Sequence, residues 1–353
     1  MQRKKLIYFF LIISTVLLLS SCYDSIEVDD MVYILAIGID KTNTNDTQYT
    51  FQAAVPLNIS SGVETGFAES EEEVTVQSIT ITSKDIFSAI ESVNSKLAKE
   101  INVSHCKLVL FSVDLSTELF KNNICAINNY NEFSPDTLTA LCQNKAIDYL
   151  DNISSPFEKN PARYYDIFFD KSFSLQSFST PVSNFEKYKT LAIPLLDKDG
   201  TVKASIISNY KNILNLSHNE TFALNSLTGS LNDGYITMEN ANISVSIKQI
   251  SSPKIQVYKN GSFPHFKINL KYQGKIFANS PEDIKNKKKI EQYIEKECIK
   301  FLNKCTTYNK DVAGLINFSR PKFFTTKSFD NYDWENKFKN SHFEVVVDFK
   351  IIN

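Results

Sequence analysis

The sequence predicts a mixed α/β (α+β) fold of three domains, in which mostly antiparallel or mixed sheets are covered by helices. Three observations lead to this prediction. The chain has 353 residues, and a single domain usually holds about 100–200. Short runs with the period of β-strands alternate with runs that have the period of α-helices, which favours sheets covered by helices. Apolar residues make up 42% and charged residues 22%, as in ordinary globular proteins.

Residues 1–21 have the pattern of a secretory signal peptide that is cleaved. The basic start Arg3-Lys4-Lys5 precedes an uncharged stretch from Leu6 to Leu19. As a helix this stretch would cover about 21 Å, which is short of the roughly 30 Å of a bilayer core. The run Leu19-Ser20-Ser21-Cys22 resembles the bacterial lipobox. That resemblance implies cleavage before Cys22 and attachment of a diacylglyceryl group to its thiol; an ordinary secreted protein with an incidental cysteine is the alternative.

The charge balance favours an anchor at Cys22 over a basic membrane-binding patch. Removing residues 1–21 takes three of the 38 basic residues and none of the 40 acidic ones, so the net charge falls from −2 to −5. A mildly acidic chain is weakly repelled by anionic lipid and has no general attraction to nucleic acid. Two or more acyl chains on Cys22 would make a stable anchor. We therefore expect membrane attachment through the Cys22 lipid, and no nucleic-acid partner.

The first expected domain covers residues 22–196. Its apolar runs alternate between strand and helix periods, and an acidic stretch at 60–73 reads as a solvated loop. The expected strands are 32–39, 48–55, 74–82, 107–113 and 137–142, and the expected helices are 84–100 with Ser83 as N-cap, 115–130 and 146–150.

A small middle domain is expected at 197–239 and a C-terminal α/β domain at 240–353. The middle domain is too short for an independent hydrophobic core and should pack against the neighbouring domains. A long helix is expected at 281–305, with its mixed Lys and Glu side chains on a solvated face. The other expected elements are strands at 202–208, 213–216 and 235–238, a helix at 219–227, an antiparallel meander of 241–249, 254–259 and 263–272, and a closing strand at 342–352.

The sequence lacks the residue patterns of the common catalytic and metal sites. It has nine glycines, none arranged as a phosphate-binding loop, and none of its four histidines has zinc-site spacing. Trp334 is interpreted as a packing residue rather than part of a ligand cleft. We expect no catalytic residues, no cofactor and no metal. The remaining cysteines, expected to be small buried hydrophobes without a disulfide framework, are Cys106, Cys125, Cys142, Cys298 and Cys305.

Several segments together resemble the Ger(x)C spore germination lipoproteins, the C subunits of nutrient germinant receptors. The first is the lipobox Cys22 followed by Ile34-Leu35-Ala36-Ile37-Gly38-Ile39-Asp40. The second runs from Asn102 through His105-Cys106-Lys107 to Leu110, and the third is Lys310-Asp311-Val312-Ala313-Gly314, followed by Trp334 and the final strand. The sequence departs from the family where Tyr23 and Ser25-Ile26-Glu27 replace the usual Trp and Arg near the anchor.

The resemblance implies three α/β domains without an enzymatic centre, and integral-membrane A and B subunits as partners. The leading hypothesis is a non-catalytic, lipid-anchored receptor subunit at the extracytoplasmic face of the spore inner membrane, needed for nutrient-triggered germination. The alternatives are a lipid-anchored ligand-binding protein of a transporter, which a deep cleft with convergent polar side chains would favour, and an envelope hydrolase that uses a histidine base.

Overall fold

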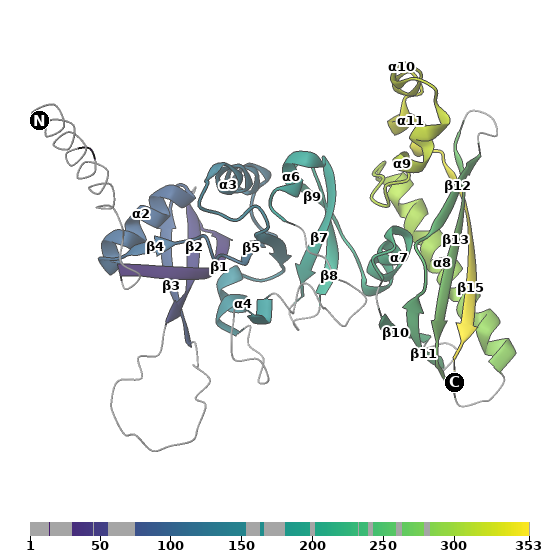
Figure 1. The fold of residues 1–353 in the computed structure, drawn as a ribbon, viewed down its shortest axis with the longest axis horizontal. Helices are drawn as coiled ribbons and strands as arrows, with labels where there is room; N and C mark the ends of the chain where they lie inside the picture. The colour runs from purple at the N-terminus through teal and green to yellow at the C-terminus, as the bar shows by residue number, and fades with distance from the viewer. Residues whose placement is uncertain are drawn as a thin grey trace, which may run out of the picture.

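The computed structural model describes Ser14 and residues 30–44, 46–55, 75–152, 163–165, 181–197, 202–231, 233–238, 243–258, 263–278 and 283–352. These residues form two lobes that lie side by side, each built on one sheet (Figure 1). Nine strands make the first sheet and six make the second, with helices against both. The predicted class of mixed sheets covered by helices is confirmed. Among the described helices, none is long and apolar enough to cross a membrane.

The first sheet is organised around β1 (Met31–Lys41), which has seven consecutive buried residues and is antiparallel to β2 and parallel to β5. The strand order is β3-β2-β1-β5-β6-β7-β8-β9, with β4 paired to the start of β1. The other strands of this sheet are β2 (Thr47–Val55), β3 (Thr75–Ser83), β4 (Glu100–Asn102), β5 (Leu108–Ser112), β6 (Leu138–Cys142), β7 (Thr190–Leu196), β8 (Val202–Ser208) and β9 (Lys211–Asn215).

Helices cover both faces of this sheet. On one face, α2 (Ile86–Leu97), α3 (Thr117–Asn129) and α6 (Asn184–Lys187) bury their apolar side chains against a core that includes Phe51 and Phe111. On the other face, α4 (Ala146–Asn152) packs over a smaller core. The sheet is therefore apolar on both sides, which explains why β1 and β5 are nearly continuous apolar runs.

The second sheet is built on β13, which pairs with three other strands. The ten-residue β15 lies parallel to it in register from His265 opposite His342 to Gly274 opposite Ile351. On its other edge β13 pairs antiparallel with β11 and β12. The strands are β10 (Asp233–Met238), β11 (Ile243–Gln249), β12 (Lys254–Tyr258), β13 (His265–Gly274), β14 (Ile276–Ala278) and β15 (His342–Ile351).

The expected three-strand meander in this region is wrong in one respect. Residues 251–253 do not reverse the chain, because β11 and β12 both run antiparallel to β13, and the N–H of Ile250 donates to Lys271 O between them. The two strands form one interrupted arm of a hairpin. The Pro253 signal marks a break in an edge strand rather than a turn.

One face of the second sheet is covered by α7 (His218–Thr228), α8 (Asp283–Thr307) and the short helices after them. The Lys304 ammonium pairs with the Glu220 carboxylate at 2.6 Å and so joins α8 to α7. Burial alone would raise the pKa of the Glu220 carboxyl, but the hydrogen bonds donated by Lys304 and by the Ser217 N–H favour the ionised form more strongly. The pKa of Glu220 is therefore lower than its usual value. The short helices are α9 (Ile316–Ser319), the 3₁₀ turn η4 (Arg320–Lys322), α10 (Thr326–Asp330) and α11 (Trp334–Phe338).

Residues 197–239 are distributed between the two sheets. Strands β8 and β9 extend the first sheet, whereas β10 pairs with β11 in the second. Between them, α7 packs with Ala204 and Ile206 of β8 in the same core as the second sheet, and the Thr221 hydroxyl accepts the Ala204 N–H. The division into three domains stays a prediction, and this stretch physically links the lobes.

The expectation that the charged side chains of α8 are all solvated is wrong for Glu291 and Glu295. Their carboxylates accept the backbone N–H groups of Phe349 (3.0 Å) and Val347 (3.1 Å) at the outer edge of β15. Residues four apart lie on one face of a helix, so the two carboxylates can both reach the edge of β15. They accept N–H groups there that a neighbouring strand would otherwise accept. This contact leaves fewer unpaired donors on an edge strand.

Candidate functional site

The lipid-attachment site predicted at Cys22 lies outside the described residues, as does the signal peptide around it. Cys22 therefore stays a prediction. The other segments that carry the family resemblance lie in the described part of the chain, where the contacts of their side chains are defined.

The motif Ile34–Asp40 lies in β1 and binds that strand to α4. A side chain at Gly38 would place its Cβ only 3.0 Å from Ala146 Cβ and 3.0 Å from Leu150 Cδ1, so glycine allows the helix to lie close to the sheet. The Asp40 carboxylate accepts the N–H groups of Ala146 (2.6 Å) and Ile147 (3.2 Å). It thus satisfies two donors at the start of α4.

Asp40 is 1% exposed, and burial raises its pKa, although the two backbone hydrogen bonds oppose the rise. Buried carboxyls with raised pKa values often belong to active sites, but structural caps produce the same shift. Here both oxygens accept backbone donors from α4. The geometry assigns Asp40 to holding the helix.

The motif Asn102–Leu110 connects neighbouring strands at one end of the same sheet. The Lys107 N–H donates to Leu35 O at 2.8 Å, and the Leu138 N–H donates to Lys107 O at 2.9 Å. His105 is exposed, and its ring lies edge-on to Tyr33 with centroids 5.3 Å apart. The backbone of this motif therefore continues the pairing of β1, β5 and β6, while its histidine lies at the surface.

The motif Lys310–Gly314 forms a turn after α8 that is held by its aspartate. The Asp311 carboxylate accepts the N–H groups of Leu315 (2.8 Å) and Ile316 (2.7 Å), and Gly314 takes a positive φ of 69°. Burial raises the pKa of Asp311 to about 6, against the opposing effect of these hydrogen bonds. Asp311 and Asp40 thus have the same role in different lobes.

Asp311 should make stability fall as pH rises through the weakly acidic range. The pKa of Asp311 is about 6 in the folded chain and 3.8 in the unfolded chain, so the folded state binds the proton more tightly. This difference stabilises the fold fully below pH 3.8, and the stabilisation is lost as the pH rises through about 6. Over this window we expect the wild type to lose up to about 3 kcal/mol relative to Asp311→Asn, which cannot ionise. Urea unfolding of both chains across the window measures this, and parallel curves would contradict it.

Trp334 and most of the cysteines lie in the cores, as predicted. Trp334 is 8% exposed and lies edge-on to Phe266 and stacked on Phe338. The five described cysteines are free, and four of them are buried. Burial raises the pKa of Cys106 to about 12, which keeps it a thiol at neutral pH. Cys125 is the half-buried member of the set.

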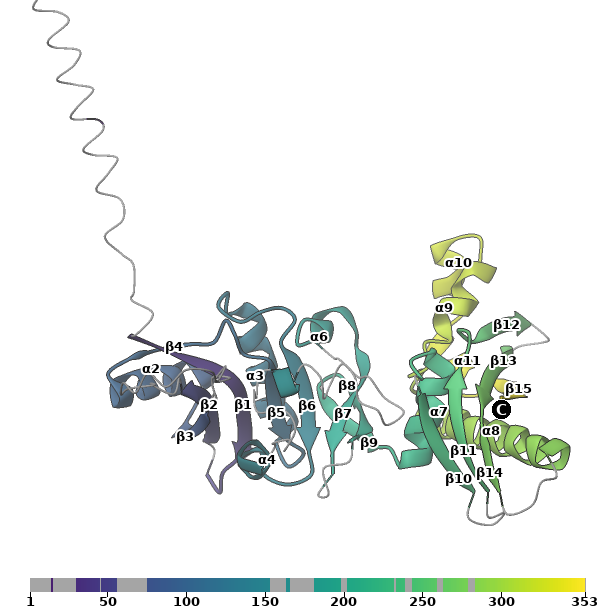
Figure 2. The same cartoon turned by 60° about the horizontal axis from the view of Figure 1, so that its bottom comes forward.

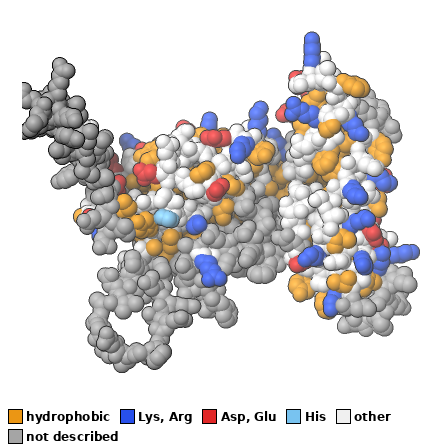
Figure 3. Space-filling view, viewed as in Figure 1, with side chains coloured by type: hydrophobic (Ala, Val, Ile, Leu, Met, Phe, Trp, Pro, Cys, Tyr) orange, Lys and Arg blue, Asp and Glu red, His pale blue; other side chains and the backbone are white. Residues whose placement is uncertain are grey.

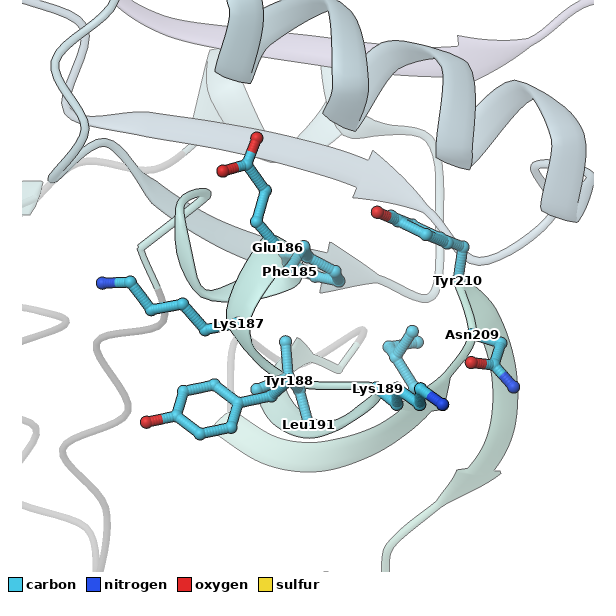
Figure 4. A pocket seen from close by; sticks show the side chains of 9 residues that line it. Phe185, Glu186, Lys187, Tyr188, Lys189, Leu191, Asn209 and Tyr210 are labelled. Carbon is cyan, nitrogen blue, oxygen red and sulfur yellow. The ribbon is translucent and has the colours of Figure 1, made fainter.

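A cavity of about 280 Å³ lies at the end of the first lobe that is nearest the second lobe, between α6 and the turn that joins β8 to β9 (Figure 4). Phe185 and Tyr210 stack across it with centroids 6.1 Å apart. Figure 4 shows the side chains of Glu186, Lys187 and Lys189 extending in different directions. The cavity therefore lacks the convergent polar groups that a specific small-molecule site requires.

The four histidines are separated in the fold, apart from His265 and His342. These two lie opposite each other on β13 and β15, with ring centroids 6.4 Å apart. Within the described ranges, no group of three His, Cys, Asp or Glu side chains could hold a metal ion.

The capping roles of Asp40 and Asp311 were not predicted, although both residues lie in segments that carry the family resemblance. Asp40 lies at the end of β1, directly after its apolar run, and Asp311 comes shortly after the end of a long helix. An aspartate at such a position was the available signal in the sequence, because its short carboxylate can reach backbone donors near the end of an element.

Family models of spore germination proteins match both lobes of the chain. Residues 24–194 match the family model described as spore germination protein N-terminal domain, and residues 203–353 match the model described as spore germination B3/GerAC-like, C-terminal. Spore germination protein KC of Bacillus subtilis (strain 168) is 26% identical over 163 residues, which are 46% of this chain and 39% of that protein. The chain thus aligns with about two fifths of that relative's length.

A solved structure described as the crystal structure of the GerBC protein resembles the whole fold. The TM-score is 0.56 at 17% identity, and the alignment covers 90% of this chain and 97% of the GerBC chain. At this identity the comparison shows a shared fold. The two-lobed arrangement is therefore one that the GerBC protein also adopts.

Proposed function

This chain belongs to the GerAC-like family of spore germination proteins, and from that premise we propose that it is a non-catalytic, lipid-anchored subunit of a nutrient germinant receptor. The observation that supports the proposal is what the two aspartates in the family motifs bind. Asp40 accepts backbone N–H groups at the start of α4 and Asp311 accepts those at the start of α9, so both carboxylates maintain a scaffold instead of facing a substrate. A scaffold of this kind acts through its surfaces.

The proposed anchor is the lipid on Cys22, at the extracytoplasmic face of the spore inner membrane. A linker of about eight residues separates Cys22 from β1 and spans at most about 28 Å. The first lobe would therefore stay close to the bilayer. The proposed partners are the integral-membrane A and B subunits of the same receptor.

Replacing Cys22 by alanine should abolish lipidation and release much of the protein from the membrane, because the lipobox contains no other thiol. Palmitate labelling and fractionation of spore membranes measure this, with nutrient-triggered germination as the functional readout. Cys125→Ala is the matched control, since Cys125 is a half-buried thiol in the first lobe. Normal retention and germination of the Cys22→Ala strain would contradict the anchor.

The receptor assignment is tested separately by purification from spore membranes. The chain should be recovered with two polytopic membrane proteins. Recovery of the chain alone, under conditions that preserve other membrane complexes, would count against a receptor subunit. The alternative of a transporter's ligand-binding protein is less well supported, because the cavity beside Tyr210 has divergent polar side chains.

A further inference from the structure

The second lobe carries a projecting segment whose chemistry differs from that of the rest of the chain. We call this segment, residues 318–327 from the end of α9 to the start of α10, the tip. The tip contains three phenylalanines and the cations Arg320, Lys322 and Lys327, and it contains no acidic residue, in a chain of net charge −2. In Figure 3, Lys and Arg side chains project at the top of the second lobe, where Figure 1 places α10.

The tip has a fixed shape that turns one phenylalanine outward. The chain leaves η4 at Lys322, and Phe323 packs inward against Phe329 (5.2 Å between centroids) and Tyr332 (4.9 Å). Two residues later, Thr325 caps α10, because its hydroxyl accepts the Ser328 N–H at 3.1 Å. Phe324 lies between these two fixed points, where Phe323 and Thr325 both have extended backbone, so its side chain must face away from Phe323.

Phe324 is completely exposed, the most of any large apolar side chain in the described residues. Phe318, on the preceding helix, is 40% exposed. The Arg320 guanidinium lies 6.0 Å from the centroid of Phe329, which positions its charge beside the aromatic cluster of the tip. The contacts of Phe323 and Thr325 fix the backbone that carries Phe324, so the tip loses little backbone entropy when this ring binds a surface.

We propose that the tip is a second membrane contact, in which Phe324 enters the interface of an anionic phospholipid bilayer while Arg320, Lys322 and Lys327 face the headgroups. The charge of the tip is complementary to such a surface, and the combination of an apolar ring with flanking cations suits the headgroup boundary. The proposal rests on the proposed anchor at Cys22. In Figure 2 the start of β1 lies at the upper left of the first lobe and α10 lies at the top of the second lobe, so an anchored first lobe allows the tip to face the same surface.

The chain as a whole is acidic, so the tip is a local exception to the prediction that no basic patch contributes to attachment. A lipid at Cys22 alone would leave the molecule free to rotate about its linker. A second contact on the other lobe would fix the orientation of both lobes against the bilayer.

The test uses the full lipidated chain in vesicles that contain brominated lipid, which quenches tryptophan fluorescence only within the bilayer. The natural chain has one tryptophan, Trp334, which is buried and serves as the baseline. The variant Phe324→Trp adds an indole at the tip, and Tyr235→Trp adds one at an exposed position on the second sheet. We expect quenching of the Phe324→Trp chain alone, in vesicles of phosphatidylglycerol with phosphatidylcholine.

The cations provide the second arm of the test. Adding Lys322→Ala or Lys327→Ala to Phe324→Trp should weaken the contact by about fivefold for each cation removed, and phosphatidylcholine alone should give less quenching. Equal quenching of Phe324→Trp and Tyr235→Trp, or none at either position, would overturn the proposal, the second result leaving the tip free for a protein partner. Flotation of the chain with the vesicles reports the Cys22 anchor independently, so its failure is distinguishable from failure of the tip.

Discussion

Gly274→Ala is expected to prevent the second lobe from folding stably. A Cβ at this position would lie 1.7 Å from Ser246 O and 2.7 Å from Ser246 C, far inside van der Waals contact with a neighbouring backbone. The strand cannot move aside at low cost, because Ser246 N donates to Lys275 O and the Lys275 N–H donates to the Ser246 hydroxyl, both at 2.9 Å. The added Cβ would also lie 3.2 Å from Phe349 Cζ, so it could not move toward that ring.

The expected loss is more than about 4 kcal/mol, which is a large share of the roughly 5–15 kcal/mol of a typical domain. Urea unfolding and hydrogen exchange of the β13 and β15 amides would measure it. Gln273→Ala is the matched control, because it shortens a half-exposed side chain at the adjacent position and adds no atom to the crowded site. Similar stability of the two variants would show that the strands can separate here without penalty.

Asp40→Ala is expected to destabilise the first lobe by about 2–4 kcal/mol. The change leaves the N–H groups of Ala146 and Ile147 without their acceptor in a buried environment, and it removes the cap of α4. Asp40→Asn is the informative comparison, since its amide oxygen still accepts one N–H and its side chain cannot ionise.

We expect Asp40→Asn to lose clearly less stability than Asp40→Ala at neutral pH. Unfolding free energies of the three chains, with hydrogen exchange of the α4 amides, provide the measurement. If both variants lost the same amount, charge rather than the acceptor geometry would be responsible, and the capping role would be wrong.

Local patterns in the sequence predicted most of the elements. The expected strand 202–208 agrees with β8, and the expected closing strand 342–352 agrees with β15 to one residue. The helix expected at 219–227 before Gly229 is α7, whose C-cap Gly229 has a φ of 78°. These elements carry strong alternation or end signals, and such signals act within a few residues of the chain.

Strand partners and contacts between distant residues were not predictable in the same way. β7 was missed because Pro194 lies within it; proline is tolerated there, since β7 pairs with β6 only at Leu195 and Leu196. The cap of α2 is Asp85 and not Ser83, because Ser83 is the last residue of β3.

The carboxylates that accept backbone N–H groups were also not predictable from the sequence. Asp40, Asp311 and Glu291 are three of 40 acidic residues, and only tertiary structure shows that backbone donors surround them. The tip was also missed, since its three short helical turns lack the long periodicity by which helices are recognised. The family segments were identifiable from the sequence, whereas the roles of the residues in those segments came from their contacts; the lipid site at Cys22 stays a prediction.

The parallel pairing of β13 with β15 determines the order in which the second lobe can form. About seventy residues separate these partner strands, so β13 has one edge unpaired until residues 342–351 reach it. Glu291 and Glu295 of α8 have no edge strand to contact before that step. The core of this lobe therefore closes only when β15 pairs with β13, and until then the free edge of β13 can pair with another molecule.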